Sequence, residues 1–260
     1  MGGEVVRSQT GGVVTLTIVR PAERNMLSDE ALRTLDQHVR TLGGDDSGRV
    51  VVLTGEGREF FCGGVFNPLQ MAGLAPAQIR ARRRRANELF DRLEGLTHPV
   101  IAAINGRAQA GGFEMALACD IRVAASHATF ALPENTWGMF PGGGGPIRLP
   151  RLVGTGKAME IIMTGWDVTA EEALRIGLVE RVTPAGGFED EVRRLAEAIA
   201  ASGPLGNRAV KKLVRSSLEM DMRSARAYSD ALREPLAASA DTAEGIAAYK
   251  EGRPPHFQGR

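Results

Sequence analysis

The chain has 260 residues, of which 24% are charged, and its formal net charge is +1 at pH 7. This length allows one sizeable domain with a hydrophobic core, and the balanced charge gives no reason to expect nucleic acid, a membrane surface or an acidic protein as the main partner. No apolar run is long enough to span a bilayer and the N-terminus lacks the basic-then-apolar pattern of a secretory signal, so we expect a cytoplasmic enzyme.

The first predicted elements are a strand and a helix. The β-branched run at residues 13–19 is typical of a strand. Ser28 predicts a helix N-terminus, because its hydroxyl can accept from a free N–H group and the acidic Asp29 and Glu30 favour that end of a helix. Apolar residues then recur at helical spacing as far as Leu42. Further along, we expect a charged helix at residues 76–96 and strands at residues 49–54, 99–104, 120–125 and 178–182.

Strands that alternate with helices predict an α/β fold with largely parallel pairing. From about residue 203 the strand patterns stop, and residues 205–236 and 242–250 are predicted to be helical. We therefore expect a core over residues 1–202 and a C-terminal helical region over residues 203–260.

Glycine-rich segments and two glutamates form the candidate site. Residues 60–65 end an apolar strand with two glycines, and residues 105–112 lead into a helix that carries Glu114. Glu134 follows Pro133 shortly before another glycine-rich turn. Backbone N–H groups at tight turns and at a helix N-terminus can stabilise an oxyanion, while two carboxyl groups beside it move protons. The combination predicts an enzyme that forms an enolate.

Other interpretations of these residues have less support. Gly111 and Gly112 could simply allow a strand to pack closely on a helix, and a lone glutamate is usually solvated. A phosphate-binding loop is disfavoured, because neither the Gly-x-Gly-x-x-Gly spacing nor a following Lys-Ser/Thr is present. The four histidines are scattered, which disfavours a Ser-His-Asp hydrolase or a zinc site. Cys62 and Cys119 lie among apolar or small residues and are expected to be reduced, buried thiols.

Over nearly its whole length the chain resembles the crotonase (enoyl-CoA hydratase/isomerase) superfamily, and within it the enoyl-CoA hydratases. The family signatures look like Phe-Cys-Ala-Gly-Ala-Asp-Leu, Asn-Gly-x-Ala-x-Gly-Gly-Gly-x-Glu, and Phe-x-x-Pro-Glu followed by Gly-x-x-Pro-Gly-x-Gly-Gly. Their counterparts here, in the same order, are Phe61-Cys-Gly-Gly-Val-Phe-Asn67, Asn105-Gly-Arg-Ala-Gln-Ala-Gly-Gly-Phe-Glu114, Phe130-Ala-Leu-Pro-Glu134 and Gly138-Met-Phe-Pro-Gly-Gly-Gly-Gly145.

The resemblance implies a spiral of ββα units followed by C-terminal helices that join chains into a trimer, or two trimers into a hexamer. It also implies a lyase of fatty acid metabolism that adds water to an acyl-CoA thioester, or removes it, with no metal and no cofactor besides the coenzyme A of the substrate. The oxyanion donors would be the N–H groups of Val65 and Gly111, and the catalytic acids would be Glu114 and Glu134. Residues assigned to substrate binding are Arg24, Gly64, Phe66, Gly112, Trp137, Phe140 and Gly142.

Several positions depart from the family pattern. Val65 replaces a small residue, and Phe66-Asn67 stands where Asp-Leu is common, so the shape of the acyl pocket and the identity of the acyl group stay open. Trp137 and Phe140 are bulky; core packing is the favoured interpretation for each, although a compact or cyclic acyl group could stack there.

The most basic stretch comprises Arg80 and residues 82–85. A solvated helix face is the favoured interpretation, with contact to the phosphates of coenzyme A as a second. A third is RNA binding, since some members of the family look like hydratases yet bind RNA in this region. The alternatives to hydration are therefore isomerisation, carbon–carbon hydrolysis or decarboxylation in the same site, or a non-catalytic RNA-binding role, which the net charge disfavours.

Overall fold

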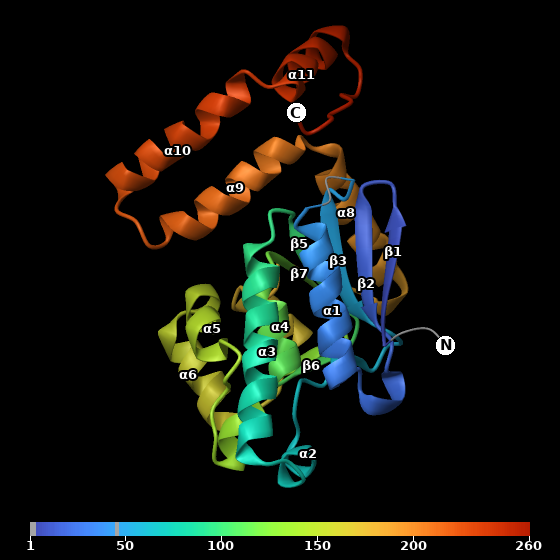
Figure 1. The fold of residues 1–260 in the computed structure, drawn as a ribbon, viewed down its shortest axis with the longest axis vertical. Coiled ribbons are helices and arrows are strands. Elements are labelled where there is room, and N and C mark those ends of the chain that lie inside the picture. The colour runs from blue at the N-terminus through green and yellow to red at the C-terminus, as the bar shows by residue number, and fades with distance from the viewer. Residues whose placement is uncertain (1–3, 45–46) are drawn as a thin grey trace.

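The computed structural model, which describes residues 4–44 and 47–260, has two β-sheets with helices packed around them (Figure 1). The larger sheet has the strand order β1-β2-β3-β5-β7-β10 and the smaller one has the order β4-β6-β8-β9. The strands of the larger sheet are β1 (Val5–Thr10), β2 (Val13–Ile18), β3 (Val50–Gly55), β5 (Val100–Ile104), β7 (Ile121–Ala125) and β10 (Arg181–Thr183). Those of the smaller sheet are β4 (Phe60–Cys62), β6 (Arg107–Gln109), β8 (Thr129–Ala131) and β9 (Val168–Thr169).

Most strand pairs are parallel, as predicted, and the antiparallel pairs among the described residues are β1–β2 and β8–β9. The chain repeats one pattern: a strand of the larger sheet is followed by a strand of the smaller sheet and then by a helix. β3 and β4 precede α2 (Pro68–Ala72) and α3 (Pro76–Gly95), and β5 and β6 precede α4 (Gly111–Ala118). β7 and β8 precede the 3₁₀-helix η2 (Pro133–Trp137) and α5 (Gly145–Val153). The predicted α/β class with ββα units is therefore confirmed.

The core lies on both faces of the larger sheet, because successive side chains of a strand point to opposite faces. In β3, Val51 and Leu53 belong to the main hydrophobic cluster, whereas Val50 and Val52 belong to a second cluster on the other face. α8 (Phe188–Ala201) covers that second face with Phe188, Val192 and Ala196. The apolar runs without polar alternation are thus strands that are buried on both sides.

The predicted helices are present with small changes of boundary. α1 (Asp29–Leu42) begins after Ser28, whose hydroxyl accepts from the Ala31 N–H at 3.0 Å as predicted. The stretch predicted to be helical at 205–236 forms two helices, α9 (Pro204–Ser217) and α10 (Met222–Ala237). Asp221 starts α10 by accepting from two N–H groups. The strand predicted at 178–182 begins only at Arg181. The remaining elements are η1 (Pro21–Glu23), α6 (Thr155–Thr164), α7 (Ala170–Arg175), η3 (Ala185–Gly187) and α11 (Ala240–Glu251).

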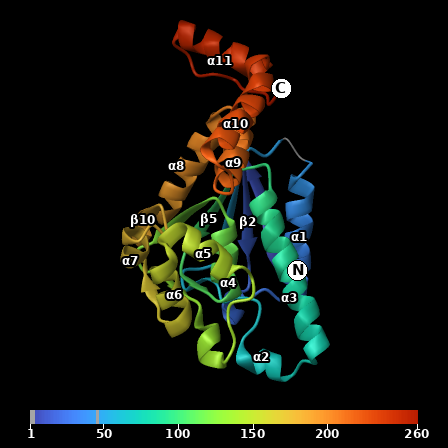
Figure 2. The same cartoon turned by 90° about the vertical axis from the view of Figure 1, so that its left-hand side faces the viewer.

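The C-terminal helices α9, α10 and α11 project from one end of the sheet-containing body (Figures 1 and 2). α10 has no buried residue, which is unusual for a helix with apolar side chains such as Met222. The division of the chain at residue 203 stays a prediction. In the described part of the chain, no helix is long and apolar enough to cross a bilayer.

The two cysteines are free and buried, as predicted. Burial raises the pKa of the Cys62 thiol and of the Cys119 thiol to about 12, which keeps both protonated at neutral pH. They act as small apolar residues, and Cys62 forms the surface on which α4 packs.

Gly112 in α4 shows how closely helix and strand approach. A Cβ atom at this position would lie 2.1 Å from the Cys62 carbonyl oxygen in β4. We expect Gly112→Ala to lower the free energy of unfolding by about 1–3 kcal/mol, because α4 must shift from β4. Gly156→Ala in α6 is the matched control, since a Cβ there meets no atom within 4 Å. Urea denaturation should show no loss for Gly156→Ala, and equal stability of Gly112→Ala and the parent protein would contradict the prediction.

Candidate active site

The glutamates and the glycine-rich segments predicted to form a site line one cavity of about 110 Å³. Most of the side chains in its wall are apolar, and the acids Glu114 and Glu134 are both buried. Sequence-predicted residues in the wall are Val65, Phe66, Gly111, Glu114, Glu134, Trp137, Phe140 and Gly142. A mostly apolar cavity with a few convergent polar groups is the usual form of a small-molecule site.

The helix α4 brings Gly111 and Glu114 to the cavity. Its N-cap, Ala110, has φ 50° and ψ −129°, a conformation that a residue with a Cβ rarely adopts, and the Ala110 N–H donates to the Ala131 carbonyl at the end of β8. The sharp turn lets α4 start immediately after β6, with its free N–H groups facing the cavity. Glu114 follows one turn into the helix.

The segment that carries Val65 lies directly against Gly111. Gly64 has φ 102°, and a Cβ built on it would lie 3.1 Å from the Gly111 nitrogen. A Cβ on Gly111 would in turn lie 3.2 Å from the Val65 nitrogen. No hydrogen bond from the N–H of Val65 or of Gly111 to another residue is found in the part of the chain described. The two predicted donors are therefore neighbours, and both are available to a ligand.

A buried asparagine fixes the position of the Gly64 segment. Asn25 is fully buried, and its side chain accepts from the Arg20 N–H and donates to the carbonyls of Glu56 and Phe60. The chain around Asn25 then holds residues 63 and 64 by two backbone hydrogen bonds, Gly63 N–H to Arg24 O and Leu27 N–H to Gly64 O. This network holds the Gly64 segment in place beside α4.

The Glu114 carboxylate lies at the N-terminus of α5. Its Oε1 atom accepts from the Gly143 N–H at 2.7 Å and from the Gly145 N–H at 2.9 Å. Burial raises the pKa of Glu114 above its ordinary value, whereas the N–H groups of Gly145 and Gly143 and the Arg148 charge oppose that rise. These contacts stabilise the ionised form of a carboxyl group that is only 3% exposed.

Glu134 has no comparable support. It lies in η2, and its buried Oε2 atom has no hydrogen-bond partner within the described residues. Burial, and then repulsion by the Glu114 charge, raise the pKa of Glu134 to about 8. Because two close carboxyl groups do not easily ionise together, the proton of the pair rests on Glu134 at neutral pH.

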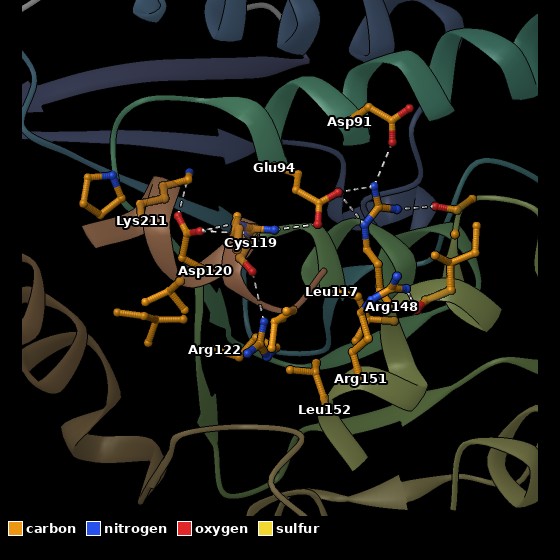
Figure 3. A pocket seen from close by; sticks show the side chains of 18 of the residues that line it. Asp91, Glu94, Leu117, Cys119, Asp120, Arg122, Arg148, Arg151, Leu152 and Lys211 are labelled. Atoms are coloured by element: carbon orange, nitrogen blue, oxygen red, sulfur yellow. Dashed lines mark hydrogen bonds and ion pairs between the residues drawn. The ribbon is translucent and has the colours of Figure 1, made fainter. Parts of the chain in front are cut away.

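Arg148 supports the glycine turn that holds Glu114. Its Nη1 atom donates to the Gly143 carbonyl at 3.0 Å, and its Nη2 atom pairs with Asp91 at 2.7 Å and with Glu94 at 2.6 Å (Figure 3). With its side chain 11% exposed and held by two carboxylates of α3, Arg148 ties α5 to α3. The orientation of the Gly143 N–H therefore depends on an ion-pair network outside the small cavity.

A larger cavity of about 790 Å³ lies between α9 and the sheet-containing body. Its carboxylates are already paired: Asp91 with Arg148, Glu94 with Arg148 and Arg215, Asp120 with Lys211 and Arg215, and Glu219 with Arg151 (Figure 3). Neither Glu114 nor Glu134 lines it. The smaller cavity is therefore the candidate active site, although the two share the wall at Asn87, Gly142 and Gly143.

Three predicted substrate-binding residues lie outside the cavity wall. Gly112 packs against Cys62, Gly64 provides the turn before Val65, and the exposed Arg24 has its guanidinium 5.7 Å from the Phe60 ring. Core packing, the favoured role for Trp137 and Phe140, is wrong for Phe140, which is 71% exposed at the cavity mouth. Trp137 is half-buried and also lines the cavity.

The basic stretch is only partly the solvated face that its sequence predicts. Arg82 has a side chain only 13% exposed; it donates to the Leu27 carbonyl and stacks 5.0 Å from the Phe66 ring. Arg85 pairs with Asp29 at 2.8 Å, so part of the positive charge is neutralised by α1. The sequence of α3 alone could not show that its arginines would contact α1.

One face of α3 also lines the cavity, which the sequence analysis missed. Arg83 and Asn87 lie four residues apart, and Asn87 donates to the Gly142 carbonyl at 2.9 Å while its buried Oδ1 has no partner among the described residues. The helical spacing of Ile79, Arg83, Asn87 and Phe90 could have revealed this face. The many charged residues of α3 instead indicated a solvated helix.

The chain is similar to known proteins over almost all of its length. Residues 8–260 match the model of the family described as enoyl-CoA hydratase/isomerase. A 2,3-dehydroadipyl-CoA hydratase of Escherichia coli is 37% identical, with 99% of each chain covered, and a short-chain-enoyl-CoA hydratase of Clostridium acetobutylicum is 34% identical, with 96% of this chain and 95% of that one. The crystal structure of an enoyl-CoA hydratase from Bacillus anthracis superposes with a TM-score of 0.96 at 36% identity, covering 99% of this chain and all of that one.

The raised pKa of Glu134 predicts a pH-dependent stability. Between the ordinary pKa of 4.5 and about 8, the unfolded chain ionises this group while the folded protein keeps it protonated, so the free energy of unfolding should fall as the pH rises. Glu134→Gln should reduce that fall, and Glu197→Gln, at an exposed glutamate of α8, should not. Urea titrations at about pH 5 and about pH 8 measure both slopes. Equal slopes for Glu134→Gln and the parent protein would disprove the assignment.

Proposed function

Because the chain belongs to the enoyl-CoA hydratase/isomerase family and is an enzyme of the hydratase type, we propose that its reaction takes place at the Glu114–Glu134 pair. The reaction is the addition of water to the double bond of a 2-enoyl-CoA, or its reverse. The observation that carries this proposal is the pair of buried carboxyl groups in one cavity. One is held by two N–H groups, and the Oε2 atom of the other has no hydrogen-bond partner among the described residues.

The thioester oxygen would be held by the N–H groups of Val65 and Gly111. Their adjacent nitrogens and the absence of other hydrogen bonds to them in the described part of the chain support this role. Negative charge develops on that oxygen when water adds, so the donors bind the transition state more tightly than the substrate. A single donor of this kind was worth about 2.7–4 kcal/mol in another enzyme. The N-terminus of α4 adds a partial positive charge in the same direction.

The two acids would divide the proton transfers between them. Glu114, stabilised as a carboxylate, takes a proton from water while the water oxygen bonds to C3 of the enoyl group. The electrons of the double bond move to the thioester oxygen, and the enolate then takes a proton at C2 from Glu134. The pKa of about 8 keeps that proton on Glu134 at neutral pH. Dehydration uses the same groups in the opposite order.

The cavity supports a short acyl group. Its volume is about 110 Å³, against about 790 Å³ for the cavity beside α9. Phe66, Trp137 and Phe140 narrow it, and Val65 adds bulk at the first oxyanion donor. We expect the reaction to need no metal and no cofactor besides the coenzyme A of the substrate. A cytoplasmic location and a place in fatty acid metabolism remain predictions.

Isomerisation of a 3-enoyl-CoA is the alternative within the family. One acid is enough to carry a proton between two carbons, and the second glutamate favours hydration instead. Conversion of crotonyl-CoA to a hydroxyacyl-CoA supports hydration, whereas conversion of only a 3-enoyl-CoA supports isomerisation. RNA binding has weaker support, because Arg82 and Arg85 of the basic stretch contact α1 and its flanking loop.

Assembly into a trimer, or into two stacked trimers, is proposed through α9–α11. The support is the exposed apolar surface of these helices, where Val214 is 57% exposed, Leu218 70% and Met222 81%. Helices that bury so little of their apolar surface are stabilised when another chain covers them.

Replacement of either catalytic acid should remove most of the turnover. We expect Glu114→Gln and Glu134→Gln each to lower kcat for crotonyl-CoA about 10²- to 10⁴-fold, because each loses one proton transfer. Binding of butyryl-CoA, measured by calorimetry, should change little, and Glu197→Gln should retain full activity. A variant that keeps its kcat would exclude that glutamate from the mechanism.

A charge in the C-terminal helices should weaken the assembly. We expect Met222→Glu in α10 to lower the molar mass measured by light scattering, since it buries a charge at the proposed interface. Leu69→Glu is the control: Leu69 is 87% exposed in α2, remote in sequence from α9–α11. A monomeric parent protein would overturn the proposed assembly.

A further inference from the structure

Arg83 differs from its neighbours in the basic stretch of α3. Arg82 donates to the Leu27 carbonyl, Arg84 is 3.8 Å from Glu88, and Arg85 pairs with Asp29. Arg83 is the member of residues 82–85 for which no hydrogen bond or ion pair is found with any described residue. Its guanidinium therefore has five donors free for a ligand.

Arg83 also lines the candidate active site. The stem of its side chain lies against Gly142, where a Cβ atom would be 3.1 Å from the Arg83 Cδ. Gly142 precedes Gly143, whose N–H holds Glu114, so the stem of Arg83 lies beside the turn that carries a Glu114 donor. Among the described residues of that wall, Arg83 is the one cation.

This cation is not needed by the catalytic acids. The charge that opposes the burial of Glu114 belongs to Arg148, which is itself held by Asp91 and Glu94. The rest of the wall near Arg83 is apolar, including Ile79, Met139 and Phe140. Arg83 is exposed, so this part of the wall is open to water. An unpaired guanidinium beside the acyl site favours an anionic group on the substrate over a plain alkyl end, because it can pair a carboxylate with two hydrogen bonds.

We propose that Arg83 binds a carboxylate at the far end of the acyl chain, so that the preferred substrates are short 2-enoyl-CoA thioesters of dicarboxylic acids. This inference rests on the proposed function, since it assumes that the thioester lies at Val65 and Gly111. The planar guanidinium matches a carboxylate with two parallel hydrogen bonds. A phosphate of coenzyme A is the other anionic group that could reach Arg83, and it would be shared by every acyl-CoA.

Binding and turnover test the proposal separately. Calorimetry compares the affinity for glutaryl-CoA with that for butyryl-CoA; neither reacts, and they differ by the distal carboxylate. Kinetics compares the kcat/KM values of glutaconyl-CoA, its monomethyl ester and crotonyl-CoA. We expect the parent protein to prefer each carboxylate compound roughly tenfold or more, a difference of about 1.4 kcal/mol. Arg83→Gln should abolish the preference while butyryl-CoA still binds, and Arg83→Lys should retain part of it. Arg84→Gln, at the exposed neighbour, should leave the preference unchanged.

Each contrary result has its own meaning. Equal binding of glutaryl-CoA and butyryl-CoA by the parent protein would overturn the proposal. An equal loss for both ligands in Arg83→Gln would assign Arg83 to a phosphate of coenzyme A and also overturn it. If no enoyl-CoA is hydrated, the proposed function fails, yet a preference for glutaryl-CoA that requires Arg83 would still support the carboxylate site.

Discussion

The hydrogen bonds from Gly143 and Gly145 to the Glu114 carboxylate connect most of the features of this protein. They allow a charged group to exist in a place that is almost closed to water, and they require the start of α5 to lie against α4. The turn that carries Gly143 is fixed by Arg148, which two acids of α3 hold in place. Three helices are thereby joined around one carboxylate.

The hydrogen bonds to Glu114 also contribute to the different protonation of the two acids, Glu114 and Glu134. Glu134 lies in the same cavity, where burial disfavours its charge and the charge of Glu114 disfavours it further. Its buried Oε2 atom has no hydrogen-bond partner in the part of the chain that the structure describes. One carboxyl group is therefore stable as an ion and the other as an acid. This difference in charge follows from burial, hydrogen bonding and repulsion, although both residues are glutamates.

Close approach of the backbone is the second constraint on the site. The segments at Gly64 and Gly111 come so near to each other that side chains at either position would collide with the opposite backbone or side chain. Gly112 allows the same approach between α4 and β4. Gly111 begins α4, and the bend that carries Val65 is held by the hydrogen bonds of Gly63 and Gly64. The two N–H groups are therefore in position without a ligand, which is the condition for stabilising a transient oxyanion.

The sequence by itself determined the α/β class, the start of α1 at Ser28 and the segments that carry the two glutamates and their glycines, because these depend on local periodicity, capping and turn chemistry. It could not show that Phe140 is exposed, that Arg82 folds back onto the loop before α1, or that residues 205–236 form two helices. Only the tertiary structure decided which face of α3 meets the cavity and which arginine on it has no partner among the described residues. Those facts depend on contacts between elements far apart in the chain, and a charged helix looks the same in sequence whether its side chains face water or a neighbouring helix.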